Sequence, residues 1–140
     1  MIRVVAGIIE RHGRILICRR QPGKIVAGKW EFPGGKMRPS ETPRQALVRE
    51  LREELNAAAN VGDLLHVVRH RYAEMNAPVQ ISFFSATIAD EPRNLAFERI
   101  VWVMRPQLPR YDFLAADRQL ISRLVRGEIE MNTARKQTHA

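Results

Sequence analysis

The chain has 140 residues, of which 45% are hydrophobic and 27% are charged, a composition typical of a single globular domain rather than of a disordered or fibrous protein. No apolar run approaches the ~20 residues of a membrane-spanning helix, and the N-terminus lacks the charged leader and cleavage site of an export signal, which argues against a membrane partner. The formal net charge of +8 favours anionic partners, but the basic residues are scattered rather than clustered, so nucleotides and free phosphates are favoured over nucleic acid.

Two apolar runs at the start of the chain predict a β-hairpin. Residues Ile2–Ile9 are almost continuously apolar and β-branched, Arg14–Cys18 continue the pattern, and Gly13 lies in the turn between them. Cys18 is the only cysteine, so no internal disulfide can form, which favours a reducing, cytoplasmic compartment. A loop is predicted over Gln21–Lys29, which contains one proline and two glycines.

The next element is a helix whose two ends are both signalled in the sequence. Thr42 and Gln45 have the spacing of a capping box, and the proline between them suits the first helical position. The helix is predicted over Pro43–Leu55, and Asn56 can adopt the left-handed conformation that ends a helix. Four apolar residues at helical spacing are expected to form its buried face: Leu47, Val48, Leu51 and Leu55.

The second half of the chain predicts three strands, a connector and another helix. In chain order these are strands over Asp63–Tyr72, Val79–Ala89 and Ile100–Met104, a connector over Arg105–Pro109 and a helix over Leu114–Val125. Residues 131–140 are polar and lack periodicity, so a flexible C-terminal tail is expected after a single domain over 1–130. The predicted fold class is α+β, with a mixed β-sheet between or beside two helices.

Four carboxylates lie within fourteen residues, at Glu41 and at Glu50, Glu53 and Glu54 on the predicted helix. The last three share one sector of the helix, and like charges at this spacing destabilise it unless a cation lies among them. Taken alone, they would be typical of a solvated charged face. That interpretation does not explain Glu41 or the Gly34-Gly35 pair, whereas a hard divalent cation explains all of them, because such ions bind clusters of oxygen ligands.

The pattern Gly35-x5-Glu41-x7-Arg49-Glu50-Leu51-x-Glu53-Glu54 resembles the Nudix box, the signature of the Nudix hydrolases. The chain departs from the family at two positions, with Asn56 and Ala57 where the family usually has glycine and a bulky aliphatic residue. The resemblance covers residues 1 to about 126, and the segment from Gly28 to Lys36 is similar to the MutT-like branch of nucleoside triphosphate pyrophosphohydrolases.

This resemblance implies a Nudix α/β/α sandwich that binds Mg²⁺, with Mn²⁺ as an alternative, and hydrolyses nucleoside triphosphates to monophosphate and pyrophosphate. It places the metal ligands at Gly34 (through its carbonyl), Glu50, Glu53, Glu54 and Glu98. Catalytic roles fall on Glu50 as ligand or general base, on Glu53 as ligand and on Arg49, which would hold the glutamates in place. For Glu98 the alternative is a glutamate at the rim of the site. A non-catalytic recognition module with the same fold would be expected to lose these glutamates, and all of them are present.

The same resemblance implies a set of substrate-binding residues: Arg20, Phe32, Gly35, Lys36 and Asp117. Arg20 could instead be an ordinary surface arginine, Phe32 a core residue and Asp117 the N-cap of the last helix. MutT-like enzymes acting on 8-oxo-dGTP have Asn at the position of Asp117, and an ionised Asp only accepts hydrogen bonds. Nucleotide-pool sanitisation of the 8-oxo-dGTP type is favoured slightly over CTP or 5-methyl-dCTP hydrolysis. The sequence leaves a monomer and a homodimer equally open.

Overall fold

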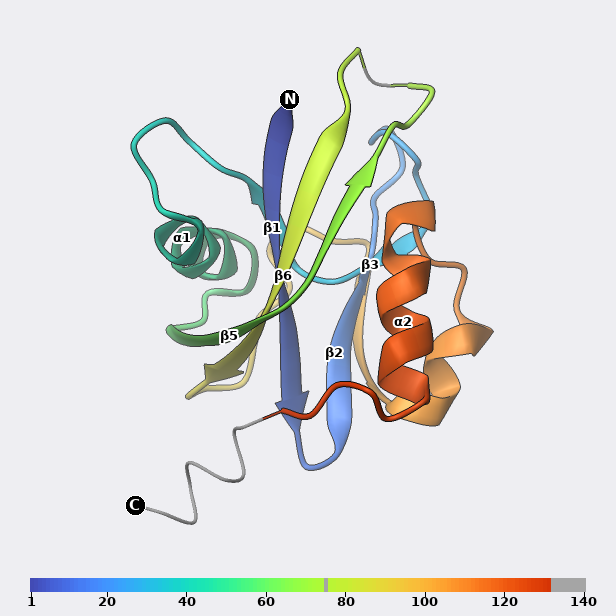
Figure 1. The fold of residues 1–140 in the computed structure, drawn as a ribbon. Helices are drawn as coiled ribbons and strands as arrows, with labels where there is room; N and C mark the ends of the chain where they lie inside the picture. Colours follow the sequence, from blue (N-terminus) through green and yellow to red (C-terminus); the bar gives the residue numbers. More distant parts are fainter. Residues whose placement is uncertain (75, 132–140) are drawn as a thin grey trace.

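The computed structural model describes residues 1–74 and 76–131, in which seven strands form one mixed sheet (Figure 1). The strands are β1 (Ile2–Arg11), β2 (Arg14–Arg19), β3 (Trp30–Glu31), β4 (Gly34–Lys36), β5 (Ala59–His70), β6 (Val79–Ile88) and β7 (Arg99–Met104). The helices are α1 (Pro43–Leu55) and α2 (Arg118–Val125), with two 3₁₀ turns, η1 (Arg105–Arg110) and η2 (Ala115–Asp117).

Strand β1 lies in the middle of the sheet and connects its two halves. The strand order is β3-β2-β1-β6-β5, with β4 paired to β1 and β7 paired to β2. The β1–β6 pair is parallel and the other pairs are antiparallel, so the sheet is mixed as predicted. The β1–β2 hairpin turns at the predicted position, with Arg11 opposite Arg14.

Alternate side chains of the sheet pack in two separate hydrophobic clusters, because successive residues of a strand point to opposite faces. On β1, Val5 and Ile9 pack in the cluster that contains Leu47 and Leu51 of α1. Ile8 of the same strand packs in the cluster that contains the apolar face of α2. The two helices therefore cover opposite faces of the sheet (Figure 1), and the predicted α/β/α sandwich is confirmed.

Helix α1 begins and ends where the sequence predicts. The Thr42 side chain accepts from the backbone N–H of Gln45, the Gln45 side chain accepts from the backbone N–H of Thr42, and Asn56 ends the helix in the left-handed conformation at φ 51°. Its buried residues are Ala46, Leu47, Leu51 and Leu55. The prediction for Val48 is wrong, since this side chain is 41% exposed and Ala46 takes its place on the buried face.

The structure also differs from the sequence prediction at several other elements. Strand β5 runs from Ala59 to His70 rather than from Asp63 to Tyr72, since Ala-Asn-Val-Gly carries little strand signal but pairs with the end of β6. The predicted connector after β7 is the 3₁₀ turn η1, and the last helix is split, with η2 preceding α2. Of the predicted tail, Met131 is partly buried against the core, and residues 132–140 lie outside the described residues. No helix in the described part of the chain is long and apolar enough to cross a membrane.

Candidate active site

The glycine pair of β4 brings the backbone against the carboxylates of α1. The Gly34 backbone N–H donates to Glu54 Oε1 at 3.0 Å, and β4 is held in turn by its pairing with β1. A side chain at Gly34 would overlap the Val5 carbonyl oxygen, and a Cβ at Gly35 would lie 2.5 Å from the carboxyl carbon of Glu50. At Gly34 only glycine fits, because the clash is with backbone, whereas a side chain at Gly35 would displace the Glu50 carboxylate from its position over the strand.

Arg49 is the centre of the carboxylate cluster. Its Nε and Nη2 atoms donate to the two Glu41 oxygens at 2.6 and 2.8 Å. Its Nη1 atom donates to Glu50 Oε1 at 2.9 Å and to Glu53 Oε2 at 3.3 Å, and Nη2 also donates to the Lys36 carbonyl at 3.0 Å. The hydrogen bonds from Arg49 and from the Arg38 backbone N–H lower the pKa of Glu41 to about 2. Glu41 is therefore ionised at neutral pH and holds Arg49 in place.

Glu54 is in a different environment from the other carboxylates. Burial, reinforced by the charges of Glu50 and Glu31, raises its pKa to about 9, although the Gly34 N–H opposes the shift. Without a cation this side chain is consequently protonated at neutral pH. A divalent metal ion beside it would reverse that preference, because metal ligands bind in their deprotonated form.

The donor set suits a hard divalent ion, since the box glutamates (Glu50, Glu53 and Glu54) offer carboxylate oxygens against an exposed strand backbone. Among the described residues, however, no group of three or more His, Cys, Asp or Glu side chains is already arranged to hold a metal ion. Two of the box glutamates are paired with arginines instead, Glu50 with Arg49 and Glu53 with both Arg49 and Arg38. Arg49 occupies one oxygen of each glutamate, Glu50 Oε1 and Glu53 Oε2, so it is the Arg38 pair on Glu53 Oε1 that metal binding requires to rearrange.

A cavity of about 360 Å³, here called the central cavity, extends from the box glutamates toward the start of α2. Its lining includes Glu54, the β4 glycines and Asp117. Further lining residues come from the loop after β2, from β3 and the residue after it, from β4, from the loop after β5 and from β6: Arg20, Lys24, Ile25, Val26, Glu31, Phe32, Lys36, Tyr72 and Ile81. The volume is in the range of small-molecule sites.

Asp117 is a buried acid without a partner in the wall of the central cavity. It is 3% exposed, and its Oδ2 atom has no hydrogen-bond partner among the described residues. Asp117 occupies the N-cap position of α2, as the N-cap alternative expects, but its side chain makes no capping hydrogen bond to the helix. Burial, with a smaller contribution from the Glu31 charge and opposed by Arg20, raises the pKa of Asp117 well above its ordinary value. A buried polar group left unpaired in this way is available to a ligand.

Arg20 is not an ordinary surface arginine. Its Nη1 atom donates to both carboxylate oxygens of Glu31 at 3.0 Å, and its Nε atom donates to the Ile25 carbonyl at 2.7 Å. Arg20 thereby connects the loop after β2 to the interior of the central cavity. The nearby Tyr72 hydroxyl accepts from the Ala116 backbone N–H at 3.4 Å.

Phe32 is a core residue that also lines the central cavity. It is 3% exposed and packs in the core against Phe83 and Phe113, with ring centroids 6.2 and 5.3 Å apart, and it also lines the central cavity. Glu98 lies outside the set of cavity-lining residues and pairs with Arg19 at 3.3 Å. Its role as a metal ligand stays a prediction, and its pairing is what the rim alternative expects.

Sequence reasoning missed Glu31, which burial and the Arg20 pair single out. Burial raises its pKa, and Arg20 opposes the shift. A signal was present, because an acid between Trp30 and Phe32 places a charge within a short apolar run. Charges in such positions are buried with a partner or serve a ligand.

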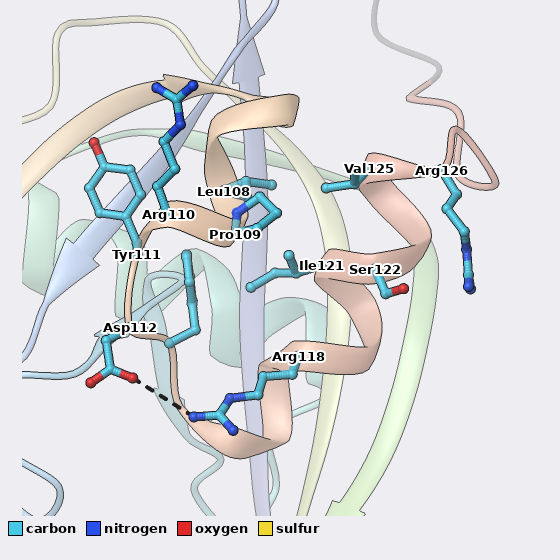
Figure 2. A pocket seen from close by; sticks show the side chains of 11 residues that line it. Leu108, Pro109, Arg110, Tyr111, Asp112, Arg118, Ile121, Ser122, Val125 and Arg126 are labelled. Atoms are coloured by element: carbon cyan, nitrogen blue, oxygen red, sulfur yellow. Dashed lines mark ion pairs between the residues drawn. The ribbon is translucent and has the colours of Figure 1, made fainter.

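A larger cavity of about 640 Å³ lies on the outer side of α2, between this helix and η1 (Figure 2). Three arginines, Arg110, Arg118 and Arg126, contribute to its lining, and Arg118 is 3.8 Å from Asp112. None of the sequence-predicted site residues lines it. Its size alone does not make it the active site, because it lacks the carboxylates and the unpaired buried acid of the central cavity.

Comparisons with known proteins identify the family of the chain. A family model described as NUDIX domain matches residues 4–123. The CTP pyrophosphohydrolase of Escherichia coli (strain K12) is 56% identical over 71 residues, and the match spans about half of each chain, 51% in both cases. The 8-oxo-dGTP diphosphatase of Haemophilus influenzae is 36% identical over 130 residues, which cover 89% of this chain and 92% of that protein. The crystal structure of a MutT NUDIX hydrolase from Burkholderia pseudomallei superposes with a TM-score of 0.78 at 30% identity, covering 86% of this chain and 95% of that one.

Proposed function

Because the chain belongs to the NUDIX domain family and is a Nudix hydrolase, we propose that it is a Mg²⁺-dependent pyrophosphohydrolase that cleaves (deoxy)nucleoside triphosphates to monophosphate and pyrophosphate. Nudix hydrolases generally use divalent metal ions, and Mg²⁺ is the ion we propose here, with Mn²⁺ as a substitute. A cytoplasmic nucleotide-pool enzyme is consistent with the single buried Cys18.

The observation that carries this proposal is the continuity of the central cavity. One hollow is lined by Glu54 and the β4 glycines, by Arg20 and Glu31, and by Asp117 at the start of α2. A nucleotide needs both ends, since its phosphates require cations and its base requires hydrogen-bonding groups in a pocket. We assign the base to the Asp117 end and the phosphates to the end beside the box.

In the proposed mechanism, Glu53, Glu54 and the Gly34 carbonyl would hold Mg²⁺, which when bound would neutralise the polyphosphate and lower the pKa of a water beside it. Glu50 would either complete the ligand set or take the proton of the attacking water. Arg49 positions Glu50 and Glu53 through its hydrogen bonds to both. The Glu41 carboxylate, which is ionised at neutral pH, keeps Arg49 in that orientation.

The state of Asp117 bears on the choice of base. Since its pKa is raised well above the ordinary value, the side chain can be neutral and can donate as well as accept, as Asn does. This removes the reason for regarding Asp117 as an acceptor only. It supports an oxidised guanine nucleotide such as 8-oxo-dGTP as the preferred substrate, in line with the Haemophilus influenzae relative. The Escherichia coli CTP pyrophosphohydrolase supports a cytidine nucleotide as the second candidate.

The test is a pyrophosphate-release assay with Mg²⁺ over 8-oxo-dGTP, dGTP, CTP, dCTP, 5-methyl-dCTP and ADP-ribose, with EDTA as the control. Metal-dependent preference for 8-oxo-dGTP is the expected result. Preference for a cytosine nucleotide would favour the second candidate. Absence of turnover with every triphosphate, from protein that is folded by circular dichroism, would refute the proposed activity.

A further inference from the structure

A second hollow lies beside the box, between the start of β1 and the loop that joins β4 to α1. This loop cavity has a volume of about 400 Å³. Three of its lining residues are basic, namely Arg3, Lys36 and Arg38. The acid in its lining, Glu41, already pairs with Arg49 at 2.6 Å. The loop cavity is therefore a cationic site with its acidic residue already neutralised, which favours a multiply charged anion.

Lys36 lines both the loop cavity and the central cavity, so one residue lies beside each of the two hollows. The backbone of Lys36 is fixed at this boundary, since its carbonyl accepts from Arg49 Nη2 at 3.0 Å and its strand pairs with β1 opposite Val4. An extended ligand that leaves the central cavity past Lys36 enters the loop cavity. In the proposed reaction, the part of a triphosphate farthest from the base is the part that extends this way.

Arg38 has a side chain that is free to serve such a ligand. Its guanidinium pairs with Glu53 at 3.3 Å, and the two side chains are 63% and 47% exposed. Ion pairs this exposed contribute little to stability, so they exchange readily for a better partner. Meanwhile the Arg38 backbone stays in place, because its N–H donates to Glu41 Oε1 at 2.8 Å. The side chain can thus move while the residue keeps its position at the cavity.

We propose that Arg3, Lys36 and Arg38 form a subsite for the terminal pyrophosphate group of the substrate, and that Arg38 joins it by leaving Glu53 when that carboxylate turns to a divalent metal ion. This inference rests on the proposed function for the identity of the substrate. The pyrophosphate group suits the loop cavity because its charge is spread over several oxygens, which guanidinium groups bind through paired hydrogen bonds. In the metal-free protein Arg38 pairs with the Glu53 carboxylate, which the metal ion needs as a ligand. The Arg38 side chain therefore couples metal binding to pyrophosphate binding.

The experiment measures binding without turnover, using inorganic pyrophosphate and Mn²⁺ as probes. Arg38→Gln should weaken pyrophosphate binding to the Mn²⁺-loaded protein by roughly tenfold, measured by calorimetry, because a charged hydrogen-bonding group is lost. The same variant should bind Mn²⁺ in the absence of any phosphate up to about fivefold more tightly, measured by electron paramagnetic resonance, since a competing ion pair is removed. The opposite signs of these effects distinguish the proposal from a general loss of folding.

Arg52→Gln is the matched control, since Arg52 is an exposed arginine on α1 beside Glu53 and lines neither cavity. It removes the same charge near the box, so any effect that it shares with Arg38→Gln is long-range electrostatics. Arg3→Gln should weaken pyrophosphate binding but leave Mn²⁺ binding unchanged. Equal pyrophosphate affinity in wild type, Arg38→Gln and Arg3→Gln would overturn the subsite, even if triphosphates are hydrolysed. Arg38-dependent pyrophosphate binding in a protein that hydrolyses none of the triphosphates would refute the proposed function and leave the subsite standing.

Discussion

Replacing Glu54 by Gln should stabilise the metal-free protein and flatten its pH dependence. The side chain is mostly buried, and burial together with the charges of Glu50 and Glu31 raises its pKa to about 9. Gln keeps the oxygen that accepts from the Gly34 N–H at 3.0 Å and has no proton to lose. The variant therefore preserves the hydrogen bond and removes only the titration.

The sign and size of the effect follow from linkage. Because the folded pKa of Glu54 lies above the unfolded value of ~4.5, the folded protein retains a proton that the unfolded chain has lost between these two values. The contribution of Glu54 to the free energy of unfolding is thus greatest below about pH 4.5 and falls as pH rises toward 9, by up to about 1.4 kcal/mol per unit. At pH 7.5 the loss reaches up to about 4 kcal/mol, which Glu54→Gln should recover.

The assay is urea denaturation in EDTA between about pH 5 and 8.5, on the wild type, Glu54→Gln and Glu74→Gln, the last being an exposed control in the loop after β5. The buried acids Glu31 and Asp117 are present in all three proteins, so their contributions largely cancel in the differences. The gap between Glu54→Gln and wild type should widen with pH, and that for the control should not. A gap that stays constant across this range would refute the reasoning. Calorimetry should further show that the wild type releases about one proton per metal ion bound near neutral pH, and that Glu54→Gln does not.

Three further predictions concern activity. Glu53→Gln should lower kcat roughly 100-fold or more, because it removes a proposed metal ligand. The urea midpoint should stay unchanged, since the side chain is half-exposed. Full turnover in this variant would show that Glu53 is not part of the site. Gly35→Ala should lower kcat about tenfold or more, because the new methyl group would lie 2.5 Å from the Glu50 carboxyl carbon, and a variant with normal kcat and metal affinity would contradict this. For Asp117, the ratio of kcat/KM for 8-oxo-dGTP to kcat/KM for CTP should fall by roughly 5- to 100-fold as pH rises and the acid ionises. In Asp117→Asn this ratio should not depend on pH. Parallel pH profiles in the two proteins would mean that Asp117 does not contact the base.

Features of the fold that local residues determine could be predicted from the sequence. Helix α1 is correct to the residue because its capping box and its left-handed stop at Asn56 are each built from neighbouring residues. Strands β3 and β4 were missed, since strands of two and three residues exist only through pairing with β2 and β1. Val48 was placed wrongly because the direction of the buried face depends on where the sheet lies.

The site divides in the same way. The box could be found from spacing alone, since its carboxylates are close in sequence and share one helix. The role of Glu31 and the unpaired state of Asp117 could not, because they depend on burial and on the pairing of Glu31 with Arg20, which only the folded chain creates. Asp117 does lie at the N-cap position that the sequence indicates, but the absence of a capping hydrogen bond could not be predicted from the sequence.

The central place of β1 also bears on the order in which the protein assembles. The elements that build the box part of the site, β1, β4 and α1, all lie within residues 2–55, so their contacts join residues closer in the chain than the β1–β6 pairing does. The base end needs the parallel pairing of β1 with β6 and the arrival of Asp117, contacts between residues far apart in the chain, which form slowly because long loops are costly to close. We therefore expect that, as the chain emerges from the ribosome, the carboxylate cluster forms before the pocket for the nucleobase.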